Sequence, residues 1–213
     1  MQTIKDKLGE LGVIPVVAIQ DAKDAADLGS ALLEGGLPCA EITFRTEAAR
    51  SSIQTLSAQF PQMLVGAGTV LTTGQAEAAV DHGAQFLVTP GFDEAVVEWS
   101  LLNDVPIFPG VATPTEINMA LRHGLNILKF FPAQAFGGIG TLKAISAPYG
   151  GVRFIPTGGI SAQNLNDYLA LPSVLACGGS WLVKKTLIAS GDFETITRLT
   201  AEAVQLVQKI RSS

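Results

Sequence analysis

Eight apolar segments of strand length recur along the 213 residues, separated by longer helix-like stretches. Strands that alternate with helices predict a parallel sheet, and strands that are apolar on both sides fit a sheet covered on both faces. We therefore predict a single α/β domain over 1–213, a (β/α)8 TIM barrel with an extra N-terminal helix. A doubly wound open sheet is the alternative. The predicted strands are residues 13–19, 39–44, 63–70, 85–91, 105–112, 126–133, 152–160 and 174–181.

Helix boundary signals support this alternation. The segment after the first strand opens on Asp21, a good N-cap, and ends in two glycines. Thr113 and Pro114 are typical of a cap followed by the first helical residue. Residues 193–213 form an amphipathic pattern, which we expect to close the barrel rather than to bind a partner.

The composition excludes several classes of protein. The chain is 47% hydrophobic and 15% charged, which is too apolar for disorder. The net charge of −5, without a basic stripe, argues against nucleic-acid binding. No apolar run approaches the roughly 18 residues of a membrane span, and the polar opening "MQTIKDKLGELG" lacks the apolar core of a signal peptide. We therefore expect a cytoplasmic protein with no membrane partner.

The histidines and cysteines do not indicate a metal centre. His82 and His123 each precede a glycine at the end of a predicted helix, where a cation and a left-handed cap are favourable. They are the only two histidines. Cys39 and Cys177 lie in separate apolar segments outside any metal-ligand spacing, so we predict buried, reduced thiols. We predict neither a metal nor a cofactor.

Lys129 interrupts an apolar strand in "NILKFFPAQ". When "AVDHGAQFLVTPG" is aligned with "ALRHGLNILKFFP", this lysine falls where the first segment has Val88, a core-type residue. A buried ammonium is costly unless it is paired or neutralised. A neutral amine is a nucleophile towards carbonyl groups and forms a Schiff base that acts as an electron sink.

Two further patterns suggest partners for this lysine. Glu41, Thr43 and Arg45 alternate along the second predicted strand and would point to one side. An internal ion pair between Glu41 and Arg45 is the structural alternative. Glycine pairs in "TGGIS" and "GGSW" follow the seventh and eighth strands, whose loops frequently bind phosphate in barrels. Two tight turns without a ligand are the alternative there.

Together these features predict a class I aldolase that acts on a phosphorylated keto acid. The features are a lysine that forms an imine, a carboxylate base, an arginine that binds a substrate carboxylate, and two loops that bind phosphate. Other classes remain open. They are a phosphate-binding isomerase or epimerase that uses Glu41 as base, a catalytically silent barrel that serves as a binding module, and a metal-dependent aldolase.

The motifs "EITFRTEAA", "VGAGTVL", "QFLVTPG", "KFFPA", "FIPTGGIS" and "GGSWLV" closely resemble 2-keto-3-deoxy-6-phosphogluconate (KDPG) aldolases, many of which also cleave 4-hydroxy-2-oxoglutarate (KHG). The resemblance runs from about Ile14 to the C-terminal helix. It implies a homotrimeric barrel, a carbon–carbon lyase without a cofactor, that splits KDPG into pyruvate and glyceraldehyde 3-phosphate. It also implies cleavage of KHG to pyruvate and glyoxylate.

The resemblance also implies site residues, and the chain departs from it at one place. Gln20 and Asp21 stand just after the first strand, where many relatives have a basic residue, which puts a cationic contact from this loop in doubt. Arg45 favours the gluconate type over the galactonate type, which reads "EIPLNSP" here. The resemblance implies that Lys129 is the Schiff-base lysine and that Glu41 is the proton-transferring carboxylate. It implies that the residues around the substrate are Arg45, Thr69, Pro90, Phe131 and Thr157. It also implies that the phosphate loops contain Gly158, Gly159, Gly179 and Ser180.

Overall fold

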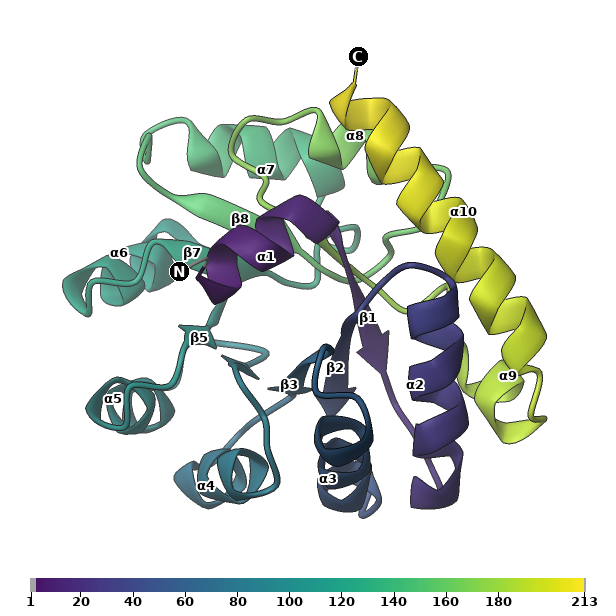
Figure 1. The fold of residues 1–213 in the computed structure, drawn as a ribbon. Coiled ribbons are helices and arrows are strands. Elements are labelled where there is room, and N and C mark those ends of the chain that lie inside the picture. Colours follow the sequence, from purple (N-terminus) through teal and green to yellow (C-terminus); the bar gives the residue numbers. More distant parts are fainter. Residues whose placement is uncertain (1–2, 213) are drawn as a thin grey trace.

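The protein, described by a computed structural model over residues 3–212, is an α/β structure in which short parallel strands alternate with helices (Figure 1). Each of the eight predicted segments contains strand structure, so the predicted alternation is confirmed. The strands are β1 (Val13–Val17), β2 (Cys39–Thr43), β3 (Leu64–Gly68), β4 (Leu87–Val88), β5 (Ile107–Phe108), β6 (Gly110–Val111), β7 (Ile127–Phe130), β8 (Arg153–Pro156) and β9 (Cys177–Gly179). The helices are α1 (Ile4–Leu11), the 3-10 turn η1 (Ala22–Asp24), α2 (Ala25–Glu34), α3 (Ala49–Gln59), α4 (Thr73–Asp81), α5 (Glu94–Leu102), α6 (Pro114–Arg122), α7 (Gly138–Ser146), α8 (Leu165–Leu169), α9 (Lys185–Ala189) and α10 (Phe193–Arg211).

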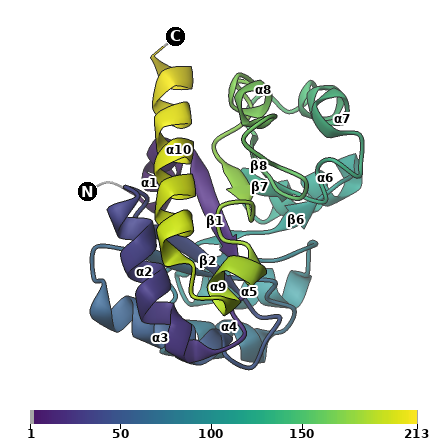
Figure 2. The same cartoon turned by 90° about the vertical axis from the view of Figure 1, so that its right-hand side faces the viewer.

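Parallel pairing joins the strands into two sheets. One has the order β5-β4-β3-β2-β1-β9 and the other the order β6-β7-β8. Strands that follow one another in the chain lie side by side, without the reversal of order found in a doubly wound sheet. The larger sheet forms a half-barrel with helices around its outside, as the two views in Figure 1 and Figure 2 show.

The fifth predicted strand, residues 105–112, differs from the prediction of one continuous strand. Pro109 divides it into β5 and β6, which belong to different sheets. Proline has no backbone N–H and cannot donate to a strand ladder. Its carbonyl still accepts a hydrogen bond from the Lys129 N–H at 2.9 Å, so the chain continues towards β7.

Of the two predicted helix starts, the structure confirms the one at Thr113 and moves the one at Asp21 by a turn. Thr113 caps α6 in a capping box with Glu116, and Pro114 occupies the first turn, as predicted. Asp21 accepts a hydrogen bond from the Lys23 N–H, but it begins the 3-10 turn η1 rather than α2. The predicted helix therefore starts at Ala25, one turn later than expected.

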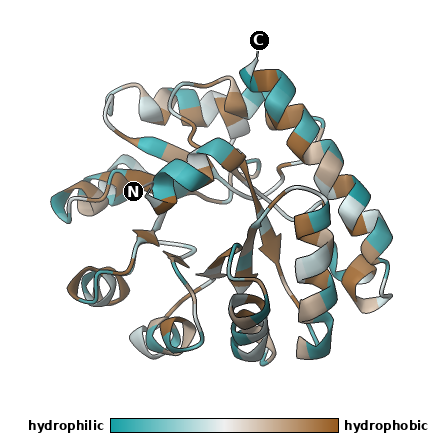
Figure 3. Ribbon diagram, viewed as in Figure 1, coloured by the Kyte–Doolittle hydropathy of each residue, from teal (hydrophilic) through white to brown (hydrophobic). Residues whose placement is uncertain are grey.

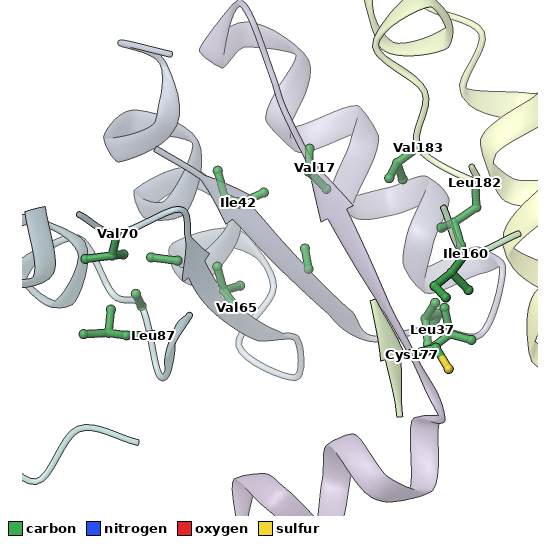
Figure 4. Close-up of a cluster of buried hydrophobic side chains, with 14 of the residues drawn as sticks. Val17, Leu37, Ile42, Val65, Val70, Leu87, Ile160, Cys177, Leu182 and Val183 are labelled. Carbon is green, nitrogen blue, oxygen red and sulfur yellow. The ribbon is translucent and has the colours of Figure 1, made fainter. Parts of the chain in front are cut away.

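Side chains alternate between the two faces of the strands. On β2, Ala40 and Ile42 pack outwards in the larger apolar cluster with the surrounding helices, part of which is shown in Figure 4. Cys39 belongs to a second, inner cluster. In Figure 3 the strands are largely hydrophobic, and the surrounding helices carry both hydrophobic and hydrophilic residues. The buried residues of the inner cluster are Leu8, Ile14, Cys39, Leu64, Phe86, Val88, Phe108, Ile155 and Ala176.

The two terminal helices cover different parts of the sheet. Leu8 of α1 packs into the inner cluster at the end where the strands begin. The helix α10 lies along α2, where Thr200 packs against Gly35 (Figure 1). Arg211, at the end of α10, donates hydrogen bonds to the carbonyls of Gly9 and Glu10 in the last turn of α1. Within residues 3–212, no helix is long and apolar enough to cross a membrane.

Candidate active site

Lys129 and Glu41 form a buried ion pair inside the strand layer. The distance from Lys129 Nζ to Glu41 Oε1 is 3.7 Å, and only 3% and 2% of the two residues, respectively, is exposed. The lysine nitrogen also lies 5.0 Å from the centre of the Phe131 ring, within range of a cation–π contact. Each charge thus has a partner, as burial requires.

The period of the strands brings these two side chains together. Glu41 lies two residues after Cys39 and so shares its inward face, while Lys129 shares the face of Ile127, which packs on the inner cluster. Their strands, β2 and β7, belong to different sheets. The pair therefore forms across the interior, directly above the apolar inner cluster.

Glu41 depends on a glycine of the neighbouring strand. A Cβ atom at Gly68 of β3 would lie 2.1 Å from Glu41 Oε1 and 2.7 Å from its carboxyl carbon. Any larger residue would force the carboxylate out of its present position beside Lys129. Within the described chain, Glu41 Oε1 accepts no hydrogen bond, so its lone pairs stay available for proton transfer.

Arg45 lies beyond the end of β2, in an exposed turn. Its Nε donates a hydrogen bond to Thr69 Oγ1 at 3.3 Å. Thr69 adopts a φ of 56°, which is strained for a β-branched residue. The partner of Glu41 is Lys129, so the alternative of an internal Glu41–Arg45 ion pair is not what the described residues form.

A cavity of about 490 Å³ opens at the carboxyl ends of the strands. The catalytic candidates lie just below it, because Thr43 and Phe131 line the cavity two residues after Glu41 and Lys129 on the same faces. Six predicted site residues are part of its wall: Arg45, Phe131, Thr157, Gly158, Gly159 and Ser180. Pro90, Thr69 and Gly179 are not in the lining. The carbonyl oxygen of Pro90 instead faces the Cα of Gly110.

The two glycine loops are shaped by close backbone approaches. Gly158 and Gly159 have φ values of 97° and 78°, a region that side-chain-bearing residues rarely adopt. The Gly158 carbonyl accepts a hydrogen bond from the Gln134 N–H at 3.0 Å, which ties this loop to the one after Lys129. A Cβ at Gly179 would lie 1.8 Å from the Trp181 ring, so Gly179 makes room for tryptophan while Ser180 is exposed.

The structure adds residues that the sequence did not single out. Gly68 makes room for Glu41, and Gly178 makes room for Thr157, whose Oγ1 would lie 2.3 Å from a Cβ there. Lys184 and Lys185 line the cavity. Gly178 belongs to the glycine pair that the sequence assigned to a phosphate loop, but its packing against Thr157 left no signal in the sequence. A surface lysine pair carries no local signal of a site.

The histidines lie where the sequence predicted. Each caps the C-terminus of a helix, and each Nδ1 contacts a backbone carbonyl, His82 at 2.7 Å from Ala78 O and His123 at 2.9 Å from Met119 O. His123 Nε2 also lies 3.7 Å from Glu94 Oε1, and Glu98 completes a group of possible metal ligands within 4.8 Å. Glu94 and Glu98 are exposed. These contacts are those of a surface ion pair between α5 and the end of α6.

A second, larger hollow of about 810 Å³ lies at the opposite end of the strands. Its wall comes from α1, the start of β7 and β8, and the end of α10, and includes Lys5, Arg153 and Arg211. Arg153 is held by a 3.0 Å hydrogen bond to the Val174 carbonyl. None of the predicted site residues lines this hollow, so the chemistry belongs to the smaller cavity.

Both cysteines are buried free thiols, as predicted. Burial raises the pKa of Cys39, with a further contribution from the Glu41 charge, and burial raises the pKa of Cys177. Below about pH 8.5, the usual thiol value, folded and unfolded chains both hold these protons. Above it the unfolded chain releases them and the folded chain does not, so stability is lost as the pH rises.

The double substitution Cys39→Ala, Cys177→Ala should remove this pH dependence. We expect the free energy of unfolding of the unsubstituted protein to fall, relative to the variant, by about 1.4 kcal/mol per pH unit for each thiol above pH ~9. Urea denaturation at pH 7, 9 and 10 measures the difference. The loss of packing by the sulfur atoms lowers stability equally at every pH. If the difference in free energy of unfolding between the two proteins did not change with pH, the raised pKa values of the two thiols would be contradicted.

Comparison with known proteins identifies the family of this chain. Residues 4–199 match the KDPG and KHG aldolase family. A 2-dehydro-3-deoxy-phosphogluconate aldolase of Treponema pallidum is 48% identical over 207 residues, which are 97% of this chain and 99% of the relative. Among solved structures, this chain is similar to KDPG aldolase from Legionella pneumophila with pyruvate captured as a covalent carbinolamine intermediate. The superposition has a TM-score of 0.90 at 40% identity, and it includes 93% of this chain and 97% of the Legionella pneumophila chain. The enzyme of Zymomonas mobilis ZM4 with 3-phosphoglycerate has a TM-score of 0.88 at 36% identity and covers 96% of both chains. This chain belongs to the KDPG and KHG aldolase family.

Proposed function

We propose that this protein is a class I aldolase that cleaves KDPG to pyruvate and glyceraldehyde 3-phosphate, and also KHG to pyruvate and glyoxylate. The observation that carries the proposal is the buried amine of Lys129, 3.7 Å from Glu41 Oε1 beneath the cavity. The name of the Treponema pallidum relative and the pyruvate carbinolamine in the Legionella pneumophila enzyme support it.

In the proposed reaction, Lys129 Nζ attacks the C2 ketone of the keto acid, and loss of water gives a protonated imine. Glu41, acting through water, removes the proton from the C4 hydroxyl. The C3–C4 bond breaks, and its electrons move into the imine to form an enamine. Reprotonation at C3 and hydrolysis of the imine release pyruvate and restore the free amine.

The remaining predicted residues would position the substrate. Arg45, oriented by Thr69, would bind the carboxylate in a bidentate manner, with Phe131, Thr157 and Pro90 around the pyruvyl end. Gly158, Gly159, Gly179 and Ser180 would bind the phosphate. These loops are remote from the breaking bond, so their binding energy would mainly hold the substrate in place.

The proposal includes a closed (β/α)8 barrel as a single domain over 1–213, with α1 as its extra helix. Two features support closure. Isolated parallel bridges from Phe154 to Val174 and from Thr157 to Gly178 link β8 to the β9 segment, and β5 and β6 adjoin one another across Pro109. The homotrimer stays a prediction from the family resemblance, and the cytoplasmic location stays a prediction from the N-terminal sequence and the chain's lack of apolar spans.

The proposed activity is tested by incubating the purified protein with KDPG and measuring pyruvate with lactate dehydrogenase. We expect turnover in the range typical of enzymes, roughly 1–10³ s⁻¹, that is unchanged by EDTA. KHG should also release pyruvate. A protein that releases no pyruvate from either keto acid would contradict the proposal, and loss of activity with EDTA would indicate a metal-dependent aldolase.

A further inference from the structure

The charged residues that line the active-site cavity are all cationic. They are Arg45, Lys184 and Lys185, and no aspartate or glutamate is among the lining residues. The chain as a whole has 19 acidic and 14 basic residues. A cavity with three cations in an acidic protein favours a ligand with more than one negative charge.

The two lysines stand on a fixed segment. Leu182 and Val183 immediately before them are buried at 0% and 1% exposure in the core (Figure 4), and the Val183 N–H bonds to the Ser180 carbonyl at 3.2 Å. Lys184 and Lys185 are exposed, and within residues 3–212 neither side chain has an ion-pair or hydrogen-bond partner. Their charges are therefore free to act on a ligand in the cavity.

The loop after β1 offers no such charge. Gln20 is neutral, and Lys23 Nζ is paired with Asp21 Oδ2 at 3.0 Å. Val17 and Ala18, just before this loop, also line the cavity. The cationic charge near the phosphate loops comes instead from the start of α9, where Lys184 is the N-cap and Lys185 the first helical residue.

We propose that Lys184 and Lys185 bind the phosphate group of the substrate together with Gly158, Gly159 and Ser180, and thereby set the preference for phosphorylated over unphosphorylated keto acids. This inference rests on the proposed aldolase function and deepens it. A phosphate monoester carries close to two negative charges at pH 7, so two cations match it. Because both side chains are exposed, their attraction is screened by salt and affects binding rather than the chemical step.

The test replaces both lysines by methionine, which keeps an unbranched side chain without the charge. In the double variant Lys184→Met, Lys185→Met we expect KM for KDPG to rise about ten- to twenty-fold at low ionic strength, and about three- to five-fold for each single change. The value of kcat should stay the same, and the difference in KM should shrink as salt is added. KM for KHG should change little, because KHG has no phosphate.

Lys143→Met is the matched control, since Lys143 is exposed on α7 and does not line the cavity. It should leave both KM values unchanged. Inorganic phosphate provides a probe that does not depend on turnover, and its affinity, measured by calorimetry, should fall in the double variant. Equal phosphate affinity in the double variant and the unsubstituted protein, or equal changes in KM for both keto acids, would overturn the lysine assignment. A protein that binds phosphate through these lysines yet releases no pyruvate would contradict the aldolase proposal alone.

Discussion

Replacing Lys129 with methionine should lower kcat/KM for KDPG by roughly 10⁴-fold or more, because the amine that forms the imine is gone. Borohydride added in the presence of pyruvate should trap a covalent adduct on the unsubstituted protein and none on the variant. Mass spectrometry of the digested protein assigns the adduct to the peptide that contains Lys129. An adduct on another lysine, or full activity in the trapped protein, would rule out the proposed imine.

The partner residue provides the control. Glu41→Gln keeps the amine, so pyruvate should still be trapped on Lys129 while KDPG turnover falls roughly 10²–10⁴-fold. Lys129→Met leaves a buried carboxylate without a partner, which costs about 3–5 kcal/mol if it stays charged. The double variant Lys129→Met, Glu41→Gln should therefore unfold at higher urea concentration than Lys129→Met. Circular dichroism of each variant shows whether its fold is retained.

Substituting Gly68 by alanine should lower kcat/KM roughly 10²-fold, although Gly68 takes no part in the chemistry. The added Cβ would lie 2.1 Å from Glu41 Oε1, so the carboxylate must leave its present position beside Lys129. Displacement of a catalytic group by about 1 Å has an effect of this size. Trapping of pyruvate on Lys129 should persist, which separates a displaced Glu41 from a loss of folding.

Gly140→Ala is the matched control for this substitution. Gly140 is exposed in the first turn of α7, and a Cβ there would meet no atom within 4 Å. Alanine favours the helix over glycine, so the variant should gain about 0.5–1 kcal/mol in free energy of unfolding at unchanged kcat/KM. Normal KDPG turnover in folded Gly68→Ala would contradict the role we give to Gly68.

The sequence predicted helices and strands well where interactions between residues close in the chain determine them. The cap at Thr113 and the eight apolar segments follow from hydrogen bonding and burial within a few residues, and the structure contains both. Residues 105–112 do not form the single strand predicted, because the missing N–H of Pro109 ends the ladder there and a second strand begins at Gly110. Asp21 was recognised as a cap, yet the sequence did not distinguish a 3-10 turn from the start of α2.

The sequence by itself determined which chemical groups are available: an amine in an apolar strand, a carboxylate and an arginine on another, and two glycine loops. The tertiary structure decided how they meet. It placed Lys129 against Glu41 across two sheets, left space beside Gly68 for the carboxylate, and brought Lys184 and Lys185 into the cavity wall. The physical reason is that alternation along a strand fixes only which side chains share a face. The packing of segments far apart in the chain fixes the distances between them, and those distances decide which groups can react together.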